Sequence, residues 1–222
     1  MIVLIMGFLK WLGLVDQTVT PPPPAKTARS GSDVFLVVVD ASPSMSECDM
    51  NGSSRYAVAT DAIEAMSKKI EQAYPDALVG VVVFWADARV EMPLQRITTS
   101  FWKKLQGLKQ KSDFGWGTSL GWGLKTAYAT LGAYSHIPKR QIIALTDGHS
   151  NGGVDPVVMA SMVKDAGIQI DVIGFAATPS DVNEYELRRV ASILDGQVRY
   201  WFINNAPDLI ARFESFGIRE VE

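Results

Sequence analysis

Short, mostly apolar runs alternate with longer amphipathic stretches along most of the chain. Strands of a parallel sheet read as continuous apolar runs because helices cover both faces of the sheet. Residues 34–39 and 78–85 carry no charged or amide side chain, and mostly apolar runs also occur at residues 141–146, 168–175 and 198–203. A period near 3.6 residues predicts helices. We expect them at residues 53–73, 98–108, 118–134, 155–166, 183–194 and 206–216.

One stretch departs from this alternation. Residues 89–94 alternate between apolar and polar positions and follow a short turn at residues 86–88, which is typical of an antiparallel edge strand. The predicted fold class is therefore α/β. We expect a Rossmann-like, doubly wound and mostly parallel central sheet of about six strands, with one antiparallel edge strand and helices on both faces.

The N-terminal part of the chain has a different pattern. Residues 1–15 are almost entirely apolar, interrupted only by Lys10, and are shorter than the ~20 residues that a membrane-spanning helix needs. They lack the basic start and the small-residue cleavage site of a signal peptide. Three interpretations stay open: an arm that docks into a partner's groove or a membrane interface, a signal peptide or anchor, and a segment packed on its own domain.

A proline run separates this arm from the rest. Pro21 to Pro24 and the small polar residues after them predict an extended linker. The expected organisation is a hydrophobic arm over residues 1–20, a Pro-rich linker over 21–32 and one domain over 33–222.

Composition and charge narrow the function. The net charge is −3 at pH 7 and the chain has no Lys/Arg-rich run, so we expect no nucleic-acid partner. A single cysteine, Cys48, excludes an intramolecular disulfide framework and a zinc site built from several cysteines. We expect a cytoplasmic protein, associated with a membrane only if the arm inserts there.

Oxygen-bearing side chains follow the first predicted strand. Asp40, Ser42 and Ser44 alternate directly after residues 34–39, and ligand sites of open α/β sheets lie at this carboxyl edge. A carboxylate and two hydroxyls can converge on one hard cation, which prefers oxygen ligands. The alternative is a turn of small polar residues that caps the next helix.

Two later segments carry matching chemistry: Gly117-Thr118-Ser119, and Leu145-Thr146-Asp147-Gly148. With the D-x-S-x-S run they make residues 33–217 resemble the von Willebrand factor A (VWA) domain family, which has a metal-ion-dependent adhesion site. One departure is Pro43, where the family most often has Gly. The resemblance implies five metal-site residues: Ser42, Ser44 and Thr118 through hydroxyls, and Asp40 and Asp147 directly or through water.

The same resemblance implies a function. The expected cation is Mg²⁺, with Mn²⁺ or Ca²⁺ as alternatives, and a Glu or Asp of a partner protein would complete its coordination. The chain would then be a metal-dependent protein–protein interaction module and not an enzyme. By family analogy the partner would be an AAA+ ATPase of the MoxR type. The alternative is a membrane-anchored or extracytoplasmic adhesion module.

Two competing motifs remain. Residues 117–121 match the G-x-S-x-G pattern of hydrolases, but no apolar strand precedes Ser119. The downstream histidines are His136, in a predicted loop, and His149, directly after the T-D-G turn, and neither is well placed for a nucleophile elbow. Residues 47–52 resemble half of a calcium loop, yet Val58 occupies the twelfth position where such loops have Glu. A second cation bound near Glu47 stays open as an alternative.

Aromatic residues cluster around the predicted site. Trp85 falls at the end of a predicted strand, and Phe114 and Trp116 precede Thr118. Because aromatic residues are enriched at protein interfaces, we expect these three, together with His149, to contact the partner. For Trp122 we expect packing beneath the loops.

Overall fold

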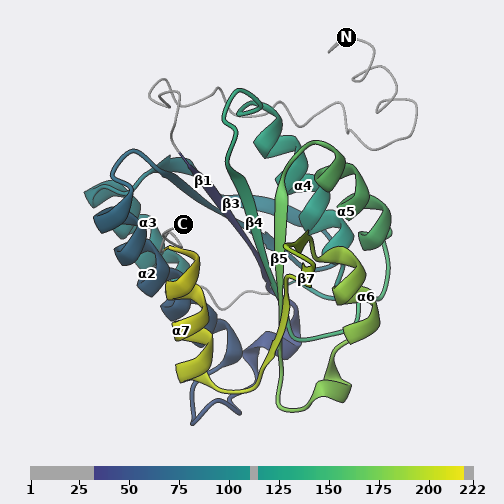
Figure 1. Cartoon of the computed structure of the whole chain (residues 1–222). Helices are drawn as coiled ribbons and strands as arrows, with labels where there is room; N and C mark the ends of the chain where they lie inside the picture. The colour runs from purple at the N-terminus through teal and green to yellow at the C-terminus, as the bar shows by residue number, and fades with distance from the viewer. Residues whose placement is uncertain (1–32, 111–114, 218–222) are drawn as a thin grey trace.

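A six-stranded sheet with the order β3-β2-β1-β4-β5-β8 forms the centre of the molecule (Figure 1). Its strands are β1 (Val34–Asp40), β2 (Leu78–Phe84), β3 (Ala88–Arg96), β4 (Arg140–Thr146), β5 (Gln169–Phe175) and β8 (Tyr200–Ile203). All neighbouring strands are parallel except β2 and β3. The predicted fold class, with its antiparallel edge strand, is confirmed.

This computed structural model describes residues 33–110 and 115–217. The arm, the linker and Phe114 lie outside the described residues, so the interpretations offered for them stay predictions. Within the described part, no helix is both long enough and apolar enough to span a bilayer.

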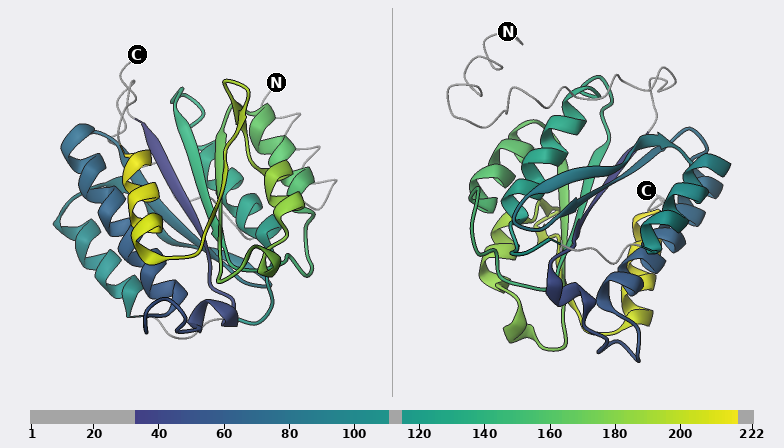
Figure 2. Two further views of the ribbon diagram at one scale, coloured as in Figure 1. Left: turned by 60° about the horizontal axis from the view of Figure 1, so that its bottom comes forward. Right: turned by 180° about the vertical axis from the view of Figure 1, so that it is seen from behind.

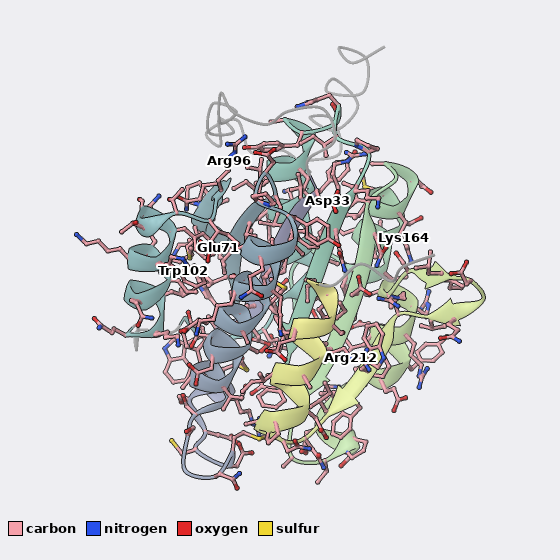
Figure 3. All side chains as sticks on the ribbon, turned by 60° about the vertical axis from the view of Figure 1, so that its left-hand side comes forward. Asp33, Glu71, Arg96, Trp102, Lys164 and Arg212 are labelled. Atoms are coloured by element: carbon pink, nitrogen blue, oxygen red, sulfur yellow. The ribbon has the colours of Figure 1, made fainter. Side chains whose placement is uncertain are left out.

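Helices cover both faces of the sheet (Figures 1 and 2). One face packs against α2 (Arg55–Ala73), α3 (Thr99–Lys109) and α7 (Ala206–Phe216). The other packs against α4 (Leu120–Gly132), α5 (Pro156–Asp165) and α6 (Glu184–Val190). Figure 3 shows α2 and α3 side by side, where the indole Nε1 of Trp102 donates to Glu71 Oε1 at 3.4 Å. Each face thus has its own apolar core.

The local structure of β1, α2 and α5 agrees with the sequence signals that predicted a strand and two helices there. All seven residues of β1 are buried, in agreement with its unbroken apolar run. Helix α2 begins after Ser54, whose hydroxyl accepts from the backbone N–H of Ala57. Helix α5 begins after Asp155, whose carboxylate accepts from the N–H groups of Val157 and Val158. These caps satisfy backbone donors that lack a partner at the start of a helix.

The strand order fixes where a ligand can bind. From β1 the chain moves outward to β2 and β3 and then returns to β4 on the other side of β1. The order therefore reverses between β1 and β4, and ligands of open α/β sheets bind outside the carboxyl ends of strands at such a point. The carboxyl end of β1 lies at the bottom of Figure 1.

One predicted element is wrong. The helix expected over residues 183–194 ends at Val190, and Ile193–Leu194 (β6) instead pairs with Gln197–Val198 (β7) in a small antiparallel hairpin. Asp195 and Gly196 connect these strands, both with positive φ. Asp-Gly is a favoured dipeptide for such a two-residue turn, so the expected strand over 198–203 is divided between β7 and β8.

Candidate metal centre

The two predicted carboxylates lie at the reversal point between β1 and β4. Asp40 is the last residue of β1, and Asp147 directly follows β4, its neighbour in the sheet. After β1 the chain forms the short 3₁₀ turn η1 (Pro43–Ser46). Pro43 is the first residue of this turn, where its fixed φ fits and its missing N–H costs nothing. The proline that departs from the family pattern therefore suits the loop.

A line of hydrogen bonds joins the first loop to the second. The Ser42 and Ser44 hydroxyl oxygens are 3.1 Å apart. The hydroxyl of Ser44 donates to Asp147 Oδ1 at 2.8 Å, across 103 positions of sequence. Because hydroxyl and carboxylate oxygens are ligands that hard cations take, this line gathers three of the five predicted metal-site residues.

Asp40 is fully buried and has only neutral partners among the described residues. Its Oδ1 accepts from the backbone N–H of Ser42 at 2.8 Å, and its Oδ2 accepts from the hydroxyl of Thr146 at 2.6 Å. Burial and the charge of Asp147 raise the pKa of Asp40 to about 7, although these hydrogen bonds oppose the rise. The folded protein therefore holds this negative charge at an energetic cost.

Asp147 has a cationic partner that the sequence interpretation did not include. Arg55 Nη1 donates to Asp147 Oδ2 at 2.8 Å. Burial raises the pKa of Asp147, and the hydrogen bonds from Arg55 and Ser44 oppose this rise. The same guanidinium contacts Glu47 at 3.0 Å and Asp49 at 2.5 Å. The guanidinium of Arg55 therefore lies beside Glu47, where the sequence left a second bound cation as an open alternative.

Thr118 reaches the same edge from the next loop. The N–H of Ser119 donates to the carbonyl of Trp85 at 2.7 Å, just beyond β2. Gly117 has φ of +77°, which favours glycine. Asn151 fixes Thr118 twice: its Oδ1 accepts from the Thr118 N–H at 3.0 Å, and its own N–H donates to the Thr118 carbonyl at 2.8 Å. These contacts place Thr118 beside the end of β2, the neighbour of β1.

This donor set fits a hard divalent cation. Among the described residues, no cluster of three or more His, Cys, Asp or Glu could hold a metal ion, so a cation here depends on hydroxyls as well as on Asp40 and Asp147. Two buried carboxylates with one arginine leave a net negative charge, which favours a cation. Oxygen-only ligands suit Mg²⁺, Mn²⁺ or Ca²⁺ more than soft metals.

Three residues of the centre were not assigned roles from the sequence: Arg55, Thr146 and Asn151. Thr146 lies inside the T-D-G motif, so its place beside Asp147 was a usable signal. Asn151 precedes two glycines, a context in which its side chain commonly binds nearby backbone. Arg55 gave no signal, because an arginine is not an oxygen ligand and a basic residue at the start of a helix is unremarkable.

The predicted contact residues differ in exposure. Trp116 is 83% exposed, the largest value among the exposed large hydrophobic residues of the described chain, and His149 is also exposed. Trp85 is half-buried and packs against Gly115, where an added Cβ would come within 2.0 Å of the indole. Trp122 is half-buried against Gly153. Of the predicted contact residues that the structure describes, Trp116 and His149 are thus the accessible ones.

The hydrolase alternative finds no support in the geometry. The hydroxyl of Ser119 is buried and has no hydrogen-bond partner within the described residues. A nucleophilic serine needs a base within hydrogen-bond reach, and no described side chain, His149 included, hydrogen-bonds to this hydroxyl. Ser119 instead occupies the N-cap position of α4.

Comparison with known proteins agrees with this arrangement. A family model described as the von Willebrand factor type A domain matches residues 35–149. That range includes all five predicted metal-site residues. A search of curated proteins gives no match.

Solved structures show the same fold. The protein BatB from Bacteroides thetaiotaomicron matches with a TM-score of 0.64 and 22% identity, covering 83% of this chain and 96% of that one. An aerotolerance-related membrane protein from Bacteroides fragilis matches with a TM-score of 0.63 and 21% identity, covering 83% and 98%. Proximal thread matrix protein 1 from the mussel byssus, with zinc in its adhesion-site motif, matches with a TM-score of 0.64 and 22% identity, covering 85% and 45%.

Proposed function

The chain belongs to the von Willebrand factor type A domain family, and from this premise we propose that it is a metal-dependent protein-interaction module. Domains of this family typically serve in adhesion or protein interaction and are usually not catalytic. The observation that carries the proposal is the line from Ser42 through Ser44 to Asp147, beside the buried carboxylate of Asp40. It gathers hard oxygen ligands at the reversal point of the sheet.

The roles of the residues follow from their chemistry. Asp40 and Asp147 provide the negative charge that favours a divalent cation, which we propose to be Mg²⁺, and the hydroxyls of Ser42, Ser44 and Thr118 provide neutral oxygen ligands. Bound there, such a cation would offer a coordination position to an Asp or Glu carboxylate of a partner. Thr146 and Asn151 orient Asp40 and Thr118 through their hydrogen bonds, and such supporting contacts are part of a working metal site.

Trp116 and His149 are the accessible side chains that we propose to contact the partner around this carboxylate. Trp116 leaves most of its indole in water, and large exposed aromatic residues are frequent hot spots of binding. The exposed tryptophan would therefore add affinity, while the bond between the cation and the partner's carboxylate would provide specificity.

The partner and the location are further proposals. By family analogy the partner is a MoxR-type AAA+ ATPase in the cytoplasm, with residues 1–20 as a second attachment point that raises the effective concentration. The relative from Bacteroides fragilis is described as a membrane protein, which supports membrane association through this arm. The alternative is an adhesion module at a surface or matrix, as the byssus thread relative suggests. Cell fractionation of the full chain with and without residues 1–20 separates these alternatives.

Asp40→Ala tests the metal bridge. We expect Mg²⁺-dependent capture of the partner from native extract to be lost, as it is for the wild type in EDTA, because the variant removes a carboxylate of the site. Asp76→Ala, at the opposite edge of the sheet, is the matched control and should bind normally. If Asp40→Ala captures the partner as well as the control does, the metal bridge is wrong. Direct titration with Mn²⁺ tests cation binding without any partner.

Trp116→Ala tests the contact surface. Because the side chain is 83% exposed, we expect folding and Mn²⁺ affinity to be unchanged. Partner affinity should fall by about 1–2 kcal/mol, as for a moderate hot spot, measured by titration with the purified partner. Unchanged partner affinity would remove Trp116 from the interface.

A further inference from the structure

Arg55 is a buried arginine at the candidate metal centre. It is the first residue of α2, and its side chain is only 6% exposed. Burying a charge is costly unless it is paired and hydrogen-bonded. Here three carboxylates provide the pairing, those of Asp147, Asp49 and Glu47. Burial alone would lower the pKa of the guanidinium, but its hydrogen bonds to Asp49 and Asp147 raise it, so Arg55 is charged.

We infer that Arg55 is the built-in counter-cation of the metal centre: it holds Asp147 in place when no divalent cation is bound and reduces the affinity for that cation. It is a positioning residue that acts through Asp147. The inference rests on the proposed metal site, and it adds to that proposal a residue that sets the strength of binding.

The two oxygens of Asp147 show how this works. Arg55 Nη1 binds Oδ2 at 2.8 Å, and the hydroxyl of Ser44 binds Oδ1 at 2.8 Å. The guanidinium therefore selects which oxygen of Asp147 faces Ser44. Because the planar guanidinium has donors in fixed directions, it can hold a carboxylate in one orientation. Asp147 is thus oriented before a cation arrives.

The other contacts of Arg55 join the loop after β1 to α2. Its Nε lies 3.2 Å from each oxygen of Asp49, and its backbone N–H donates to the carbonyl of Glu47 at 3.1 Å. Glu47 directly follows η1 as its C-cap residue, and this turn includes Ser44. One side chain therefore connects Asp147 to the segment that presents the serines.

Charge gives the direction of the effect. The guanidinium already neutralises part of the negative charge that attracts a divalent cation, and the two cations repel each other. Binding of one at this cluster therefore disfavours the other, which is a negative coupling between them. An arginine with a purely structural role would instead stabilise the metal-free and metal-bound forms equally.

The experiment measures Mn²⁺ binding to the full chain without a partner, from the EPR signal of free Mn²⁺. Arg55→Met removes the charge, and we expect the Kd for Mn²⁺ to fall at least about fivefold, the low end of typical coupling energies. Arg55→Lys keeps the charge and loses the planar donor geometry, so its Kd should stay within about twofold of wild type while its thermal midpoint falls.

Arg96→Met is the matched control. Arg96 pairs with Asp76 at 2.7 Å, at the opposite edge of the sheet where β2 begins (Figure 3). The same charge is removed far from the centre, so the Kd for Mn²⁺ should not change. A fivefold change in this control would mean that overall charge, and not Arg55, sets the affinity, and would overturn the inference.

Asp49→Asn keeps the experiment decisive if Arg55→Met does not fold. Asp49 lies in a loop with 30% of its side chain exposed. Removing its charge leaves more of the guanidinium's positive charge uncompensated, so the Kd for Mn²⁺ should rise about twofold or more. An unchanged or lower Kd in this variant, or an unchanged or higher Kd in Arg55→Met, overturns the inference. Failure of the wild type to bind Mn²⁺ at all would instead overturn the metal site itself.

Discussion

Two buried aspartates of the central sheet have opposite surroundings. Asp171 in β5 and Asp40 at the end of β1 are both fully buried. Asp171 accepts from Arg199 Nε at 2.6 Å and from the side-chain amides of Gln141 and Gln169 at 2.7 Å each. Asp40 has only the N–H of Ser42 and the hydroxyl of Thr146, with Asp147 close enough to raise its pKa.

The difference shows which kind of burial indicates function. A buried carboxylate with a paired cation and further hydrogen bonds is a structural element, because its charge is compensated within the fold. A buried carboxylate with neutral partners and a second carboxylate nearby is costly for the fold alone. Asp40 lies at the edge where ligands of this architecture bind, so we attribute its cost to ligand binding.

Asp171→Asn should give the largest change in stability. The substitution leaves Arg199 without its carboxylate in a partly buried place, and breaking such a pair costs about 3 kcal/mol. We expect the free energy of unfolding by urea to fall by about this amount, in EDTA and in Mn²⁺ alike. The Kd for Mn²⁺ should stay the same. A change in that Kd would mean that the two aspartates are not independent.

Asp40→Asn should change stability in the other direction. With EDTA at pH 8, removing the uncompensated charge should raise the free energy of unfolding by about 1 kcal/mol, while Mn²⁺ binding is lost. Urea unfolding of the wild type and the variant, each with EDTA and with Mn²⁺, measures both effects. A variant that is less stable than the wild type in EDTA would show that the fold needs the Asp40 charge.

A partly exposed cluster of Glu64 with two lysines provides the smallest effect and a third point of comparison. Hydrogen bonds from Lys109 and Lys68 lower the pKa of Glu64 to about 2. Its ionised form therefore stabilises the fold above about pH 4.5, and this contribution is lost as the pH falls towards 2. Solvent screening limits it to about 0.5 kcal/mol.

The matched variant for this cluster is Glu64→Gln. The difference between its free energy of unfolding and that of the wild type should be about 0.5 kcal/mol at pH 6 and disappear near pH 2. A difference that stays constant over this range would show that packing of the side chain, and not its charge, is responsible.

Apolar periodicity was sufficient to predict most of the fold. The runs that became β1, β2, β4 and β5 are buried on both faces, so their pattern has little ambiguity. The expected helix over residues 183–194 failed at a specific place. Its apolar spacing continued past Val190, but the Asp195-Gly196 turn reverses the chain there. The signal of a single dipeptide is easily outweighed by a longer periodic pattern.

The candidate site was predictable only in part. Asp40, Ser42, Ser44 and Asp147 come together because strand ends of a parallel sheet share one edge, which follows from topology alone. Arg55 could not be found in this way. Its importance depends on where α2 starts relative to β4, a tertiary relation that no local pattern encodes.

A cavity at the amino-terminal edge of the sheet, opposite the metal centre, has a consequence for how the domain can be connected. Asp33, the first described residue, and Phe216, near the last, both line one cavity of about 400 Å³. The two described ends therefore lie near each other, at the edge of the sheet opposite the metal centre. The length of β1, about 23 Å for seven residues, separates them from that centre. Joining residues 33 and 217 by a short peptide, with new ends opened in a surface loop, should give a circular permutant that still folds. Its binding edge would be as open as before.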